Sequence, residues 1–179
     1  MEAVRARALR ATRALATAGI PYAVTGGNAV AAWVARVDRA AVRNTQDVDI
    51  LVRRSDLPAI RIALEAAGFH YREIFGVTCF LDTPDSHPRD AIHLVFAGEN
   101  VKPNDLAPTA DIEERTDAED FEIVELEALV RMKLTSYRDK DRTHLRDMIA
   151  IGLIDTTWPS RYPASLADRL QQLLDDPEG

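Results

Sequence analysis

The segment Asp47–Val52, with the sequence DVDILV, constrains the fold of this chain more than any other. Its two acidic residues, Asp47 and Asp49, alternate with aliphatic residues. Because successive side chains of a β-strand point to opposite faces, this alternation predicts a strand with both carboxylates on one face and apolar side chains on the other. Two neighbouring carboxylates repel each other unless a cation lies between them. The segment therefore predicts a core strand that carries a cation site, and Mg²⁺ is the divalent ion that such oxygen ligands suit, commonly together with substrate phosphates.

A pair of glycines precedes this strand in the sequence. The apolar segment 22–25 predicts a short strand, Gly26-Gly27 ends it, and residues 28–37 predict a buried helix. Glycine lets a backbone approach a ligand closely, and the N–H groups at a helix N-terminus bind phosphate. A plain tight turn is the alternative interpretation of the glycines alone. Next to the acidic pair, they favour a phosphate-binding turn.

The remaining pattern predicts an α+β protein: a small mixed β-sheet core flanked by helices, with a C-terminal helical section. Residues 1–98 form the expected α/β core, residues 99–124 an acidic connection, and residues 125–179 a helical section packed on the core. Further strands are expected within 69–81 and at 91–96 and 121–124, and further helices at 3–18, 55–68, 125–137, 140–151 and 164–175.

Composition excludes several classes of protein. The longest uncharged apolar run, residues 29–35 of the 179, is far too short to span a membrane, so no membrane partner is expected. Cys79 is the single cysteine, which excludes an internal disulfide, and a cytoplasmic location is expected. Residues 1–61 hold ten arginines and five acids, whereas residues 99–127 hold eleven acids and two basic residues. This asymmetry is compatible with a local basic cleft for phosphates, and it makes the acidic segment a candidate surface for a protein partner.

A second group of candidate residues lies in the C-terminal section. Lys133 falls on an apolar stripe of the helix expected at 125–137, where its ammonium must either extend to solvent or meet an anion. A nucleotide phosphate or Asp47 would satisfy it. Asp141 shares a helix face with Leu145, so it is expected to point inward, where it can orient Lys133 or Arg43 or form a structural ion pair between helices.

These residues resemble the DNA polymerase β-type nucleotidyltransferase superfamily. The pattern Arg43-x-Thr45-x-Asp47-x-Asp49 is most similar to its AbiEii-like branch, which includes toxins of abortive-infection and toxin–antitoxin systems. Lys133, followed by the segment 138–145 (RDKDRTHL), resembles a second motif of that branch. The resemblance implies transfer of a nucleoside monophosphate from a nucleoside triphosphate to a hydroxyl group, with pyrophosphate leaving.

The resemblance also implies roles for individual residues. Asp47 and Asp49 would hold Mg²⁺, and Lys133 would neutralise phosphate charge together with Arg43. The residues expected to bind the nucleotide are Gly26, Gly27, Asn28, Arg43, Thr45 and Lys133, and those expected at the catalytic centre are Asp47, Asp49, His93, Lys133 and Asp141.

The sequence departs from the family pattern at His93. Members that use two metal ions usually carry a third acid on a later strand, and in the strand expected at 91–96 its place is taken by histidine. Histidine accepts a proton near neutral pH but is a poorer Mg²⁺ ligand than a carboxylate. Three functions therefore stay open: an active Mg²⁺-dependent transferase, an inactive nucleotide- or partner-binding relative, and a toxin. The acceptor, whether RNA, protein or small molecule, does not follow from the sequence.

Overall fold

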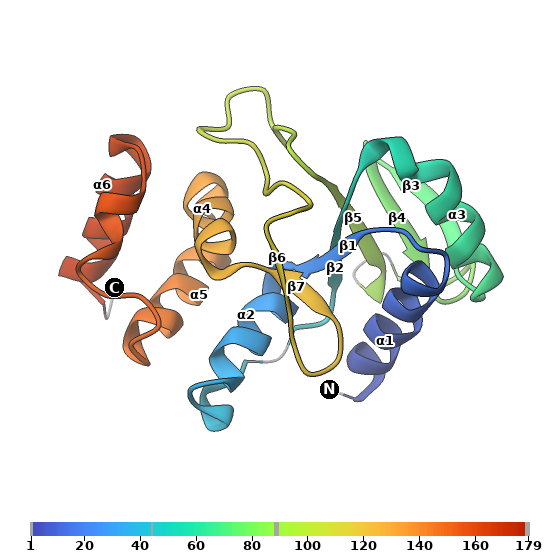
Figure 1. The fold of residues 1–179 in the computed structure, drawn as a ribbon, viewed down its shortest axis with the longest axis horizontal. Helices are drawn as coiled ribbons and strands as arrows, with labels where there is room; N and C mark the ends of the chain where they lie inside the picture. The colour runs from blue at the N-terminus through green and yellow to red at the C-terminus, as the bar shows by residue number, and fades with distance from the viewer. Residues whose placement is uncertain (1, 44, 88–89, 178–179) are drawn as a thin grey trace.

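The computed structural model describes residues 2–43, 45–87 and 90–177, which form one mixed β-sheet with helices packed against it (Figure 1). The sheet has seven strands in the order β3-β4-β5-β2-β1-β7-β6. This arrangement confirms the predicted α+β class with a mixed sheet. The strands are β1 (Tyr22–Thr25), β2 (Val48–Val52), β3 (His70–Ile74), β4 (Val77–Leu81), β5 (Ile92–Phe96), β6 (Arg115–Asp117) and β7 (Glu122–Val124).

Strand β2 lies at the centre of the sheet, as its apolar composition requires. It pairs with β1 in the antiparallel direction and with β5 in the parallel direction. Val48, Ile50, Leu51 and Val52 are completely buried. Because the register places Asp49 opposite Thr25 on one side and opposite His93 on the other, the polar end of β2 gathers side chains from three strands.

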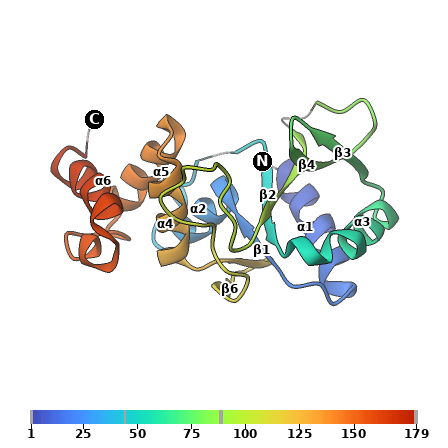
Figure 2. The same cartoon turned by 90° about the horizontal axis from the view of Figure 1, so that it is seen from above.

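The helices form two groups at opposite ends of the molecule (Figures 1 and 2). Helices α1 and α3 pack against each other on the β3–β4 side, whereas α4, α5 and α6 form a bundle at the other end, with α2 packed between α5 and the central strands. None of the described helices is long and apolar enough to cross a membrane. The helices are α1 (Glu2–Thr17), α2 (Gly26–Ala35), α3 (Leu57–Ala66), α4 (Leu126–Ser136), α5 (Asp139–Ala150) and α6 (Ala164–Asp175).

The acidic segment is more ordered than its sequence indicates. Strand β6 was not predicted, because only three residues pair there, at the edge of the sheet and antiparallel to β7. Many acids of the segment form ion pairs with arginines of the same chain, such as Glu99 with Arg54 and Glu114 with Arg131. The basic and acidic blocks of the sequence therefore neutralise each other to a large extent within the fold. Further pairs join Arg5 to Asp120, Arg39 to Glu119, Arg53 to Glu113 and Arg161 to Glu127.

Candidate active site

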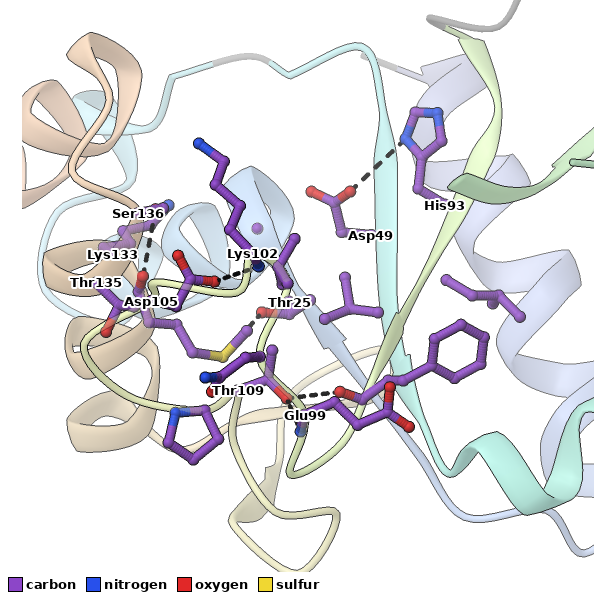
Figure 3. Close-up of a pocket in the computed structure, with 18 of the residues that line it drawn as sticks. Thr25, Asp49, His93, Glu99, Lys102, Asp105, Thr109, Lys133, Thr135 and Ser136 are labelled. Atoms are coloured by element: carbon purple, nitrogen blue, oxygen red, sulfur yellow. Dashed lines mark hydrogen bonds and ion pairs between the residues drawn. The ribbon is translucent and has the colours of Figure 1, made fainter. Parts of the chain in front are cut away.

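The two acids of the DVD pattern lie side by side where β2 begins. Asp47 immediately precedes the strand and Asp49 belongs to it, and His93 stands opposite Asp49 on β5. One ligand atom from each of these three residues lies within 4.8 Å of the other two. Figure 3 shows His93 directed toward Asp49, with 3.7 Å between Nδ1 and Oδ1. The predicted placement of both carboxylates on one face of the strand is therefore observed.

Polar side chains hold Asp47 in place. The Thr45 hydroxyl donates a hydrogen bond of 2.7 Å to Asp47 Oδ1, and the Asn28 amide donates one of 2.7 Å to the Asp47 carbonyl oxygen. The Lys140 ammonium lies 3.8 Å from Asp47 Oδ2. Partial burial raises the pKa of Asp47, but the Thr45 hydrogen bond and the Lys140 charge outweigh it and bring the pKa below its ordinary value. The carboxylate is therefore ionised at neutral pH and able to bind a cation.

Two glycines let the start of α2 lie directly against this site. Gly26 has φ +63°, and a Cβ built on it would stand 2.0 Å from Asp49 Oδ2. A Cβ on Gly27 would stand 2.9 Å from the Thr45 hydroxyl oxygen. A side chain at position 26 would therefore occupy the space of the Asp49 carboxylate. The glycines are required by this close approach, as well as by the turn that joins β1 to α2.

A buried ion pair forms the other wall of the site. The Lys133 ammonium on α4 lies 3.3 Å from Asp141 Oδ1 on α5, and the two side chains are only 5% and 2% exposed. The sequence left open whether Lys133 extends to solvent or meets an anion; in the structure it is buried and paired with Asp141, which points inward as expected. Asp141 also accepts hydrogen bonds from the Ser136 hydroxyl at 2.7 Å and from the Arg138 Nε at 2.7 Å.

The ionisation states follow from these contacts. Burial raises the pKa of Asp141, but the Arg138 hydrogen bond and the Lys133 charge outweigh it and lower this pKa to about 2. Burial lowers the pKa of Lys133, and the Asp141 charge opposes that shift. His144 Nδ1 lies 3.0 Å from the Lys133 ammonium, and burial together with that positive charge lowers the pKa of His144 to about 4. His144 is therefore neutral at physiological pH and accepts a hydrogen bond from Lys133.

Asp47, Asp49, His93, Lys133 and Asp141 all line one cleft with a volume of about 560 Å³. Its walls come from the sheet, from α4 and α5, and from the segment that follows β5 (Figure 3). Acids and cations are mixed along the walls, so the cleft combines a cation-binding pair with groups that attract an anion. The charged and ionisable residues that line it are Asp47, Asp49, Arg54, His93, Glu99, Lys102, Asp105, Lys133, Arg138, Lys140 and Asp141.

The structure brings most of the predicted site residues together but leaves Arg43 outside the cleft lining. Arg43 forms a two-pronged pair with Asp147 of α5, at 2.6 and 3.0 Å, and its side chain is 63% exposed. Asn28 and Thr45 contact Asp47 rather than line the cleft. Lys140 lies in the RDKD segment but was not predicted as a site residue. Its pairing with Asp47 leaves no local pattern in the sequence, because only the fold brings α5 next to Asp47.

The donor set fits a divalent cation. The carboxylate groups of Asp47 and Asp49 lie beside the imidazole of His93. Carboxylate oxygens are the hard ligands that Mg²⁺ takes. Asp47 and Asp49 can hold such an ion between them, because a cation there relieves their mutual repulsion. His93 completes the group as a nitrogen donor, which Mg²⁺ accepts less readily than transition-metal ions such as Zn²⁺ do.

Comparisons with known proteins agree with this geometry. The sequence pattern of a family described as uncharacterised nucleotidyltransferase matches residues 2–165. No curated protein matches the chain.

Several solved structures share the fold. A nucleotidyltransferase-like protein from Paracoccidioides brasiliensis superposes with a TM-score of 0.65 at 20% identity, over 98% of this chain and 88% of that one. The antibiotic-resistance factor ANT(2'')-Ia gives a TM-score of 0.58 at 12% identity, over 97% and 91% of the two chains. JHP933 from Helicobacter pylori gives 0.52 at 17% identity, over 99% and 76%. At these identities the likeness concerns the fold alone.

The close approach of Gly26 to Asp49 predicts a specific effect of Gly26→Ala. The added methyl group must displace the Asp49 carboxylate, so we expect loss of divalent-cation binding, measured by calorimetric titration. Gly19→Ala is the matched control, because Gly19 also has positive φ, +67°, but nothing lies within 4 Å of its Cβ position. Both variants bear the strain of a left-handed residue, about 1–2 kcal/mol. Unchanged cation binding in Gly26→Ala would contradict the assignment.

The low pKa of His144 predicts acid sensitivity of the fold. An unfolded histidine has a pKa of about 6.5, so the unfolded chain takes up a proton that the folded chain refuses between that pH and about 4. Stability from this group is complete above pH 6.5 and is lost as the pH falls through that window. From pH 7.5 to 5 we expect a loss of about 2 kcal/mol in the free energy of unfolding, measured with urea. His144→Asn should remove this loss, whereas a variant of the exposed His70, His70→Asn, should retain it.

Proposed function

We propose that this chain, which belongs to a family of uncharacterised nucleotidyltransferases, transfers a nucleoside monophosphate from a nucleoside triphosphate to a hydroxyl group in a Mg²⁺-dependent reaction. The observation that carries the proposal is the cluster of Asp47, Asp49 and His93 in the same cleft as the buried cation Lys133. A cation site beside positive side chains suits a substrate that is itself a complex of a metal ion with a polyphosphate.

Asp47 and Asp49 would hold Mg²⁺ in this reaction. When bound, the ion supplies positive charge that neutralises and orients the triphosphate. Thr45 and Asn28 would keep Asp47 in its binding geometry through the two hydrogen bonds that they donate. Gly26 would leave room for the Asp49 carboxylate, and the N–H groups at the start of α2 would face the phosphates.

The positive charges for the phosphates would come from α4 and α5. Lys133 and Lys140 line the cleft, as does Arg138 at the start of α5. In this proposal Lys140 and Arg138, rather than Arg43, neutralise the phosphate charge. Arg43 instead connects the segment before β2 to α5 through its ion pair with Asp147. Asp141 would act as a positioning residue, because it fixes Lys133 and Arg138 at once.

His93 would take the proton of the acceptor. The hydroxyl oxygen forms a bond to the α-phosphorus while the bond from that phosphorus to pyrophosphate breaks, and the hydroxyl proton passes to the imidazole. A histidine can perform this transfer near neutral pH. The position of His93 beside Asp49 supports this role, because an attacking hydroxyl would stand at the edge of the proposed metal site.

A second function has one observation in its favour. Histidine in the place of a third carboxylate suits an inactive relative that binds a nucleotide or a partner without transferring anything.

The AbiEii-like branch, a toxin role, and a protein partner for the acidic segment 99–127 remain predictions from the sequence. Growth arrest on expression, relieved by the product of a neighbouring gene, would identify a toxin.

Asp49→Asn is expected to abolish transfer without unfolding the protein, because the amide keeps the shape of the carboxylate but loses its charge. The measurement is pyrophosphate release with each nucleoside triphosphate in turn, supplied with RNA, protein and small-molecule fractions of a cell extract as acceptors. Asp56→Asn, directly before α3 and outside the cleft, is the control and should retain activity. Full activity in Asp49→Asn would refute the site.

His93 distinguishes the two functions. In an active enzyme, His93→Ala should lower the rate of transfer by about 100-fold, since a positioned base contributes about that factor or more. His93→Asp should retain or raise the rate with Mg²⁺, because a carboxylate is both a base and a better ligand for this ion. If the wild-type chain transfers nothing and only His93→Asp is active, the chain is a nucleotide-binding protein rather than a transferase.

A further inference from the structure

The lysines of this chain are distributed in an unusual way. Of its 22 basic residues only three are lysine, at positions 102, 133 and 140, and the rest are arginine. All three lysines line the cleft, whereas among the arginines that the structure describes only Arg54 and Arg138 do. Lysine differs from arginine in being a compact charge on a flexible stem, which suits contact with a phosphate that moves during a reaction. Lys102 is the lysine to which the proposed mechanism gives no task.

Lys102 belongs to a loop, residues 99–109, that we call the strap. Its two ends are joined: the Thr109 amide donates to the Glu99 carbonyl at 2.9 Å, and the Thr109 hydroxyl donates to the Phe96 carbonyl at 2.6 Å. Glu99 is further held by Arg54, whose guanidinium stacks over the Phe96 ring at 3.6 Å. The strap therefore has a fixed base at the end of β5.

A turn at the far part of the strap fixes the backbone of Lys102. The Asp105 amide donates to the Lys102 carbonyl at 3.0 Å, and the Asp105 carboxylate accepts a hydrogen bond of 2.8 Å from the Lys102 amide. Of the two nearest acids in the sequence, Asp105 is thus bound to the lysine's backbone and Glu99 is paired with Arg54. Figure 3 shows the Lys102 side chain extending from the strap into the space between α4, which carries Lys133, and β2, which carries Asp49.

The charges of the cleft single out Lys102. Lys133 and Arg138 are paired with Asp141, Lys140 with Asp47, and Arg54 with Glu99. Within the part of the chain that the structure describes, Lys102 is the cleft cation whose ammonium forms no ion pair. It remains unpaired although residues 99–127 contain eleven acids. The positive charge of Lys102 is therefore not offset by a carboxylate of the cleft, and it is available to an anion that enters.

We propose that Lys102 is a binding residue for the phosphates of the nucleoside triphosphate, carried over the cleft by the strap. This inference rests on the proposed function and extends it to a segment that the sequence motifs do not include. The ammonium contacts the β- and γ-phosphates, which leave as pyrophosphate, and stabilises their charge as the bond to the α-phosphorus breaks. The flexible stem lets the contact persist as pyrophosphate moves away.

The test is calorimetric titration of the full chain in Mg²⁺ with the nucleoside triphosphate that the wild type binds most tightly. Lys102→Met should raise Kd about tenfold, which corresponds to about 1.4 kcal/mol, and Lys102→Arg should retain most of the affinity. The nucleoside without phosphates should bind equally to wild type and Lys102→Met. Because Lys102 is exposed, its variants should have the melting temperature of the wild type.

Arg13→Gln is the matched control, since it removes one exposed positive charge on α1, outside the cleft. Equal weakening by Arg13→Gln and Lys102→Met would mean that only net charge matters, and it would overturn the inference. An unchanged Kd in Lys102→Met, in a protein whose binding is lost in Asp47→Asn, would also overturn it while the proposed function stands. If the wild type binds none of the four triphosphates, the proposed function fails as well.

Discussion

The repulsion between the carboxylates of Asp47 and Asp49 is the constraint on which the rest of the site depends. A strand that places two negative charges on one face is stable only if its surroundings supply positive charge or hydrogen-bond donors. The chain supplies them from separate segments: Thr45 from the preceding loop and Lys140 from α5. The elements that surround β2 are therefore those that make the acidic pair tolerable, and the same elements form the walls of the cleft.

The buried pair of Lys133 and Asp141 connects this strand site to the C-terminal helices. Removing one member of a buried ion pair usually costs about 3–5 kcal/mol, because the other charge is left without a partner. Such a pair therefore fixes α4 against α5, and with it the positions of Arg138 and Lys140 relative to the sheet. The geometry of the cleft depends on contacts between helices as much as on the strand that carries the acids.

Features of the fold and of the site could be predicted where the local sequence has a clear periodic pattern. Alternation in DVDILV indicated both the strand and the shared face of its carboxylates. The apolar stripe around Lys133 left open whether its ammonium meets solvent or an anion, and the pairing with Asp141 was one of those alternatives. Strand β6 was missed because three residues at a sheet edge leave no periodic signal. The partner of Arg43 was not foreseen either, since its pairing with Asp147 depends on how α5 packs against the loop before β2. Long-range packing, which no short pattern records, determines these contacts.

A crystal of the protein grown with Mn²⁺ and a nucleoside triphosphate analogue that resists cleavage at the α-phosphorus would test the central claim most directly. Mn²⁺ takes the place of Mg²⁺ at sites built from oxygen ligands, and its anomalous scattering locates it without ambiguity. The account predicts a peak between the carboxylates of Asp47 and Asp49, with the phosphates directed toward Lys133 and Lys140. A peak elsewhere, or nucleotide bound away from the two acids, would contradict it.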